Sequence, residues 1–61
     1  MTSSKDIIKQ LKADGWYLHA IVGSHHHYKH HIKKGKVTVP HPKKDIKKGT
    51  EQAILKQAGL K

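Results

Sequence analysis

Cysteine and arginine are both absent from this 61-residue chain, and each absence narrows its chemistry. Without cysteine, neither disulfide bonds nor a thiolate zinc site can stabilise so small a fold, so secondary structure must do so. Without arginine, the guanidinium fork that reads guanine edges is missing, which disfavours sequence-specific base recognition. No segment approaches the ~20 apolar residues of a membrane span, and no signal peptide is evident, so we expect no membrane association and a cytoplasmic location.

Positive charge dominates what is present. Thirteen lysines stand against four acidic residues, which gives a formal net charge of +9. Such a charge attracts polyanions and releases counterions from phosphates, so nucleic acid is the expected partner. Lysine acts as a point charge, which predicts backbone-directed, salt-sensitive binding with little sequence selectivity. A chain this short buries only ~60% of its surface on folding, so we expect a shallow surface site that suits a polymeric substrate.

Helical signals lie towards both ends of the chain. Ser3 and Asp6 have the spacing of a capping box, and apolar residues at helical spacing then predict a helix that runs to about residue 13. Gly15 is expected to end this helix in the left-handed conformation. Gly49 and Thr50 are expected to cap a second helix near the C-terminus.

Between the helices, alternating and β-branched residues predict strands over residues 16–22, 25–32 and 36–39. Leu18 and Val22 are expected on the buried side of the first strand, and Tyr28 and Ile32 on the core side of the second. The predicted fold class is therefore α+β, in the order α-β-β-β-α, with a three-stranded antiparallel sheet and both helices on one face. We expect residues 1–61 to form one domain.

Histidines gather in the second predicted strand, which holds His25, His26, His27, His30 and His31. The run is internal, so a purification tag does not explain it. Alternation with Tyr28 places His26 and His30 on the core side and the other three, together with Lys29, on the outer side. For any single histidine, simple decoration of a solvated strand is the alternative, but the cluster as a whole favours a functional site.

Clustered imidazoles suit the cleavage of RNA. Histidine titrates near neutral pH, so one ring can accept a proton while a charged neighbour donates one, without a metal. The 2′-hydroxyl of RNA attacks the adjacent phosphate once it is deprotonated, and lysines stabilise the charged phosphorane that follows. A metal ion shared by His25 and His27 with His31 or His41 is the competing interpretation of the same cluster.

Several short motifs, taken in order, resemble the HicA toxin family. They are Asp14, Gly15, Trp16; Gly23, Ser24, His25; Val37, Thr38, Val39, Pro40; Lys48, Gly49, Thr50; and residues 54–60. The resemblance covers essentially the whole chain and implies a fold like the double-stranded RNA-binding domain. It also implies a toxin of a type II toxin–antitoxin system, namely a metal-independent endoribonuclease that cuts messenger RNA and is held inactive by a HicB antitoxin over its active site.

The resemblance places the catalytic general base on His25, which follows the Gly-Ser step. His26 is the second choice, because some relatives align their histidine one place later. A protonated His27, or a lysine, is the possible general acid. The residues expected to bind RNA are Ser24, Lys29, Lys33, Lys34, Lys36, Lys43 and Lys44. The expected partners are messenger RNA and a HicB-like antitoxin, with no metal and no small-molecule cofactor.

Two other functions fit the same fold less fully. A non-catalytic RNA-binding module would use the helices and loops to recognise a duplex by shape and charge. A DNA-binding regulator ranks last, because neither predicted helix carries the turn and polar face of a helix-turn-helix recognition unit.

Overall fold

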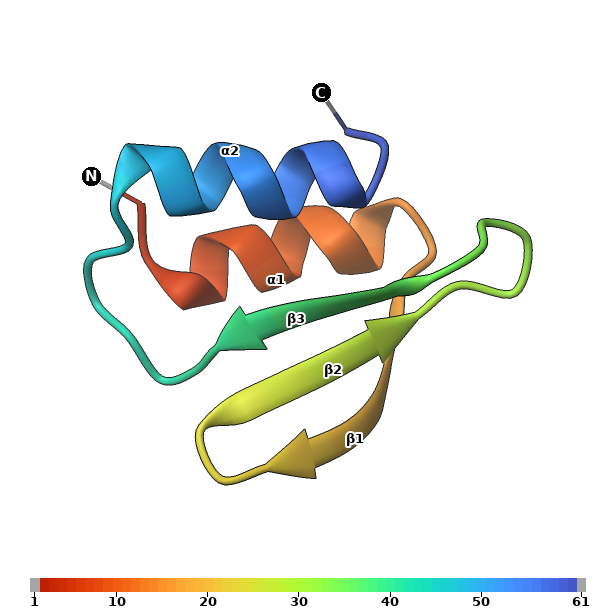
Figure 1. Ribbon diagram of the computed structural model, residues 1–61, viewed down its shortest axis with the longest axis horizontal. Helices are drawn as coiled ribbons and strands as arrows, with labels where there is room; N and C mark the ends of the chain where they lie inside the picture. The colour runs from red at the N-terminus through yellow and green to blue at the C-terminus, as the bar shows by residue number, and fades with distance from the viewer. Residues whose placement is uncertain (1, 61) are drawn as a thin grey trace.

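The computed structural model describes residues 2–60 and has the predicted order α-β-β-β-α, so the α+β fold class is confirmed (Figure 1). The elements are α1 (Ser4–Ala13), β1 (Tyr17–Val22), β2 (His25–Lys29), β3 (Lys36–Pro40) and α2 (Lys48–Gln57). The strands form one antiparallel sheet with β2 in the centre. Within residues 2–60, neither helix has the length and apolar character needed to cross a bilayer.

Both ends of α1 follow their local sequence. Ser3 accepts a hydrogen bond from the Asp6 backbone N–H, and the Asp6 carboxylate accepts one from the Ser3 backbone N–H, which completes the predicted capping box. Gly15 has a φ of +101°, a backbone conformation that glycine adopts without steric cost. Trp16 then turns back, and its backbone N–H donates to the carbonyl oxygen of Leu11.

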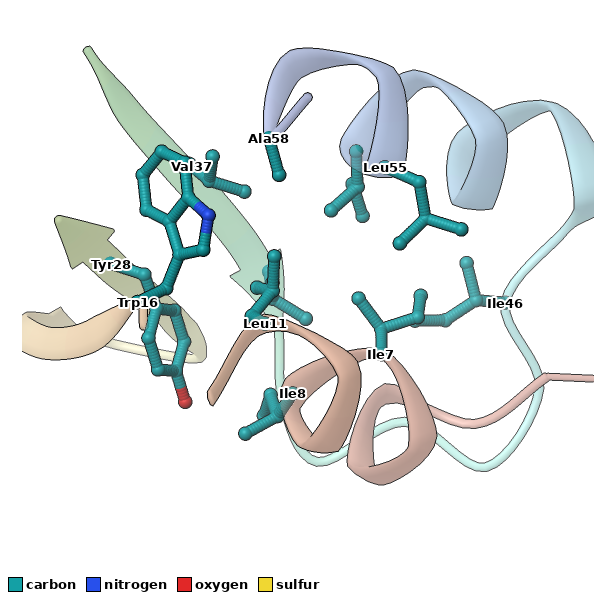
Figure 2. Close-up of a cluster of buried hydrophobic side chains, with 11 residues drawn as sticks. Ile7, Ile8, Leu11, Trp16, Tyr28, Val37, Ile46, Leu55 and Ala58 are labelled. Atoms are coloured by element: carbon teal, nitrogen blue, oxygen red, sulfur yellow. The ribbon is translucent and has the colours of Figure 1, made fainter. Parts of the chain in front are cut away.

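The core lies between the two helices and one face of the sheet. Both helices pack against β3, whose Val37 and Val39 are fully buried on the same face as Tyr28 of β2. Figure 2 shows side chains of α1 and α2 converging with Val37, Tyr28 and Trp16. No residue of β1 belongs to this cluster, and Figure 1 shows β1 as the edge strand farthest from the helices.

The predicted burial of β1 is wrong. Leu18 is 44% exposed and Val22 is 65% exposed, because no helix covers this edge strand. A bulge between Leu18 and Ala20 also changes which side chains share a face. Leu18 pairs with Tyr28 and Ile21 pairs with His26, so Ile21 replaces Val22 on the helix side of the sheet.

The second strand is shorter than predicted, and Ile32 does not face the core but is 76% exposed. His30 is the cause. Its Nδ1 accepts hydrogen bonds at 3.0 Å from the backbone N–H groups of both Ile32 and Lys33, which turns the chain away from the ladder. Its Nε2 lies 2.8 Å from the carbonyl oxygen of Asp14, and its ring packs on Trp16.

The predicted cap of α2 is also wrong. The helix begins one residue before Gly49, so Gly49 and Thr50 lie in its first turn rather than at its cap. Lys47 occupies the N-cap position with an extended backbone and no side-chain hydrogen bond. The apolar face of α2 is nevertheless as expected, because Ile54 and Leu55 are buried in the core.

Candidate functional site

The register of β2 against β3 sorts the clustered histidines onto two faces of the sheet. His26 pairs with Val39 and therefore lies on the helix side, as the alternation predicted. His25 pairs with Pro40 and His27 with Thr38, which places both histidines on the open face. The sequence candidates consequently do not form one site, and each face has to be considered separately.

The helix side of the sheet holds a hollow of about 350 Å³ next to α1. It exists because both helices pack against β3, which leaves the helix side of β1 and of part of β2 uncovered. Apolar side chains form part of its wall, namely Ile8, Leu18 and Tyr28. Its polar lining consists of two lysines of α1, Lys5 and Lys12, and of two histidines, His26 and His41.

His26 and His41 contact each other in this hollow. Their ring centroids are 4.8 Å apart and their planes are inclined by 72°, an edge-to-face arrangement. The backbone N–H of His41 donates to the carbonyl oxygen of Ser24 at 2.7 Å, so the loop after β3 lies against the turn between β1 and β2. Two titratable rings from separate segments therefore share one concave surface.

His41 is held in place by a buried hydroxyl. Ser4, the first residue of α1, is only 1% exposed, and its Oγ lies 2.7 Å from His41 Nδ1. The same Oγ accepts a hydrogen bond from the backbone N–H of Lys43 at 2.9 Å and lies 3.1 Å from the Lys43 carbonyl oxygen. These contacts fix the imidazole at a position defined by two elements distant in sequence.

Lys5 and Lys12 were missing from the sites predicted from sequence, and His41 was considered there only as a possible metal ligand. The two lysines flank Ile8 on one side of α1 at spacings of three and four residues, a pattern that marks a shared helix face. His41 directly follows Pro40, which pairs with His25. An explicit pairing of the predicted second and third strands would therefore have brought His41 next to the histidine cluster.

His27 lies on the opposite face from the hollow. Its Nδ1 is 2.8 Å from Thr38 Oγ1. Loss of hydration lowers the pKa of His27, and the charges of Lys36, His25 and His19 lower it further. The lowered pKa favours the neutral ring, which does not suit the role of proton donor that the sequence suggested.

The lysines expected to bind RNA have different environments. Lys29, Lys34 and Lys36 are exposed around an open depression of about 710 Å³ at the loop between β2 and β3. Lys43 and Lys44 are exposed in the loop after β3, and Ser24 is exposed in the turn between β1 and β2. These positions leave their side chains accessible to a polyanion.

Lys33 differs from the other lysines expected to bind RNA because its ammonium group forms bonds within the protein. It forms an ion pair with Asp14 and donates a hydrogen bond to the carbonyl oxygen of Ala58 at 3.1 Å. The hydrogen bond from Lys33 holds the pKa of Asp14 below its usual range, against the opposing effect of partial desolvation. Lys33 therefore joins the C-terminal ends of the two helices.

The metal site considered from histidine spacing is not formed by the described residues. Within residues 2–60, no three histidine, aspartate or glutamate side chains are grouped closely enough to hold a metal ion. The open-face pair His25 and His27 is separated by the sheet from His41, which lies on the helix side.

Comparison with known protein families gives a match that covers nearly the whole chain. The family model described as HicA toxin of bacterial toxin-antitoxin matches residues 4–60, a range that begins with α1 and extends beyond α2. No curated protein matches the chain.

Proposed function

The chain belongs to the HicA family of toxins of bacterial toxin–antitoxin systems, and we propose that it acts as a metal-independent endoribonuclease that cleaves messenger RNA. Family membership supports the toxin role and implies an antitoxin partner, which we propose to be a HicB-like protein. The net charge of +9 supports a polyanionic substrate and fast association with an acidic partner.

The observation that carries the proposal is the pair of imidazoles beside two lysines in the hollow. His26 and His41 are in contact, and Lys5 and Lys12 line the same surface. Cleavage of RNA by its own 2′-hydroxyl requires a group that removes the hydroxyl proton and cations that stabilise the phosphorane. The hollow has both kinds of group, and its open shape admits a polymer.

We propose His26, rather than His25, as the general base. The resemblance in sequence favoured His25, which follows the Gly-Ser step. His25, however, is exposed on the open face, whereas His26 is half-buried in the hollow next to the two lysines of α1. A base acts only within hydrogen-bond reach of the proton that it removes, so a position beside the phosphate-binding cations favours His26.

RNA beyond the cleaved bond would be held by exposed lysines outside the hollow, around the loop between β2 and β3 and in the loop after β3. These are Lys29, Lys34, Lys36, Lys43 and Lys44, with Ser24 in the neighbouring turn. Lys33 is left out of this set because its ammonium group is already paired with Asp14. Binding through lysines predicts an affinity that falls steeply with salt and depends little on base sequence.

The experiment compares wild type with His26→Ala and His25→Ala on a long single-stranded RNA in excess chelator, with analysis of the fragment ends. His19→Ala is the matched control, since His19 is an exposed histidine of β1 outside the hollow. We expect wild type to leave cyclic-phosphate ends and His26→Ala to cut roughly 10²- to 10⁴-fold more slowly. His19→Ala should cut as wild type does.

Each contrary outcome identifies a different error. If His25→Ala loses cleavage while His26→Ala retains it, the general base is His25. If wild type binds RNA in a salt-dependent way and leaves it intact, the protein is the non-catalytic RNA-binding module. If cleavage appears only when a divalent metal is added, the mechanism is not metal-independent.

A further inference from the structure

Ser4 has an unusual environment for a polar residue at the first position of a helix. The capping of α1 is performed by Ser3, so the hydroxyl of Ser4 is not needed to cap the helix. Ser4 is nevertheless 1% exposed and turns its hydroxyl towards His41 and the backbone of Lys43. A buried hydroxyl has a cost unless its hydrogen bonds are made, and these contacts supply them.

The hydrogen bonds of the Ser4 hydroxyl define the tautomer of His41, that is, which ring nitrogen carries the proton in the neutral ring. The Ser4 hydroxyl has a single proton to donate, and it accepts a hydrogen bond from the Lys43 backbone N–H. Only one assignment gives a proton to every contact: the hydroxyl donates to the Lys43 carbonyl oxygen, and His41 Nδ1–H donates to the hydroxyl. The Nδ1 proton then stays in place, and only Nε2 gains or loses a proton.

His41 Nε2 makes no hydrogen bond to any group of residues 2–60, and the ring lines the hollow beside His26. The groups that face the pair are Lys5 and Lys12 of α1 and Tyr28 of β2, with no carboxylate among the residues that line the hollow. Within residues 2–60, the His26 ring makes no hydrogen bond and contacts His41, whereas the His41 ring is held at Nδ1 by Ser4 and keeps Nε2 available for proton transfer.

We propose that His41 is a second catalytic residue, the general acid that protonates the leaving 5′-oxygen, and that Ser4 is its positioning residue. This inference rests on the proposed ribonuclease function. His26 takes the proton of the 2′-hydroxyl, and the 2′-oxygen forms a bond to phosphorus. The bond between phosphorus and the 5′-oxygen breaks, and Nε2–H of protonated His41 gives its proton to that oxygen. The products are a 2′,3′-cyclic phosphate and a 5′-hydroxyl, so protons and electrons balance without a further reactant.

The test uses two RNA oligonucleotides that share one site cleaved by wild type. One has the natural 5′-oxygen at that bond, and the other has sulfur in its place, because a thiolate leaves without being protonated. His41→Asn is the informative variant, since the amide N–H of asparagine can still donate to Ser4 while its side chain cannot act as an acid. His26→Ala and His19→Ala serve as the base variant and the matched control.

We expect His41→Asn to cut the oxygen substrate roughly 10²- to 10⁴-fold more slowly than wild type and the sulfur substrate within about tenfold of the wild-type rate. His26→Ala should be slow on both substrates, and His19→Ala on neither. An equal loss on both substrates by a folded His41→Asn protein would overturn the acid role, and so would full activity on the oxygen substrate. If wild type cuts neither substrate, the proposed ribonuclease function fails before the role of His41 is reached.

Discussion

His30 and His41 stand at opposite ends of the sheet, and their hydrogen bonds differ in number. Both ring nitrogens of His30 are used inside the protein: Nδ1 accepts from two backbone N–H groups, and Nε2 contacts the Asp14 carbonyl oxygen. His41 uses only Nδ1, which contacts Ser4, and its Nε2 has no partner within residues 2–60. The end of the sheet with His30 is therefore a closed end, where both ring nitrogens are bonded within the protein. The end with His41 is an open end, where Nε2 has no partner within residues 2–60.

This difference separates a histidine with a structural role from one available for catalysis, in a chain with seven histidines. A ring whose two nitrogens are both bonded has no lone pair or proton to exchange, so His30 fixes a turn and packs on Trp16. A ring held at one nitrogen keeps the other available in a defined direction, which is what proton transfer requires. The number of unbonded ring nitrogens therefore distinguishes His30 from His41, whereas solvent exposure does not, since both side chains are half-buried.

The strongest test of the comparison is His30→Ala. It removes the ring from Trp16 and leaves two backbone N–H groups and one carbonyl oxygen without their partner, so we expect a loss of about 3 kcal/mol in the free energy of unfolding. The midpoint of thermal unfolding should fall by roughly 15 °C, while cleavage per folded molecule stays as in wild type.

His31→Ala is the control for that experiment. His31 is exposed and only stacks on the ring of His30, so its loss should change the free energy of unfolding by less than about 0.5 kcal/mol. If His30→Ala is as stable as wild type but no longer cuts RNA, the assignment of His30 as structural is wrong.

Gly15→Ala tests the closed end of the sheet through the backbone conformation of Gly15, which lies against the His30 ring. The φ of +101° is strained for any residue with a Cβ, and the new Cβ would lie 2.8 Å from His30 Nε2. We expect a loss of about 2 kcal/mol in the free energy of unfolding, measured by urea denaturation.

Gly35→Ala supplies the matched control, because Gly35 has a similar φ of +93° with no atom within 4 Å of an added Cβ. Its loss should be only about 1 kcal/mol. Equal losses in the two variants would mean that contact with His30 contributes nothing to the constraint on Gly15.

Much of the fold could be predicted from sequence because its signals are local. The capping box of Ser3 and Asp6 and the left-handed Gly15 act within a single turn of chain. The errors arose where a side-chain hydrogen bond or the arrangement of the helices on the sheet overrides the alternation of apolar and polar residues. Ile32 alternates correctly with Tyr28, but the imidazole of His30 bends the chain before the pattern can continue, and that side-chain contact is invisible to periodicity.

The candidate site was harder to predict because it depends on which elements leave a surface uncovered. Alternation along β2 separates His26 from His25, yet it does not show that the helices would both pack on β3 and leave a hollow beside His26. The contact between Ser4 and His41 spans most of the sequence. No local sequence pattern around Ser4 or around His41 predicts this contact.

Ser4→Ala tests the open end of the sheet. Removing the hydroxyl deprives His41 Nδ1 and the Lys43 N–H of a partner, which should lower the free energy of unfolding by about 1.5 kcal/mol. Nitrogen NMR of the histidine rings should show that neutral His41 carries its proton on Nδ1 in wild type and loses this preference in Ser4→Ala.

Ser3→Ala is the matched control for Ser4. It removes the cap of α1, which costs about 1 kcal/mol, and should leave the protonated nitrogen of His41 unchanged. If the wild-type ring carries its proton on Nε2, the hydroxyl of Ser4 is the donor and the orientation argued for His41 is reversed.

The smallest effect concerns the closed end and depends on pH. Because the pKa of Asp14 is held below its usual range by Lys33, folding favours the carboxylate over the acid. The ion pair therefore adds stability above the pKa of an unfolded aspartate, near 4, and this contribution is lost as the pH falls through the lower pKa of the folded state. The thermal midpoints of wild type and Asp14→Asn should differ at pH 7 and converge as the pH falls below the lowered pKa of Asp14. A constant difference across that range would show that Lys33 does not stabilise the charged form of Asp14, and the closed end would then depend on His30 rather than on charge.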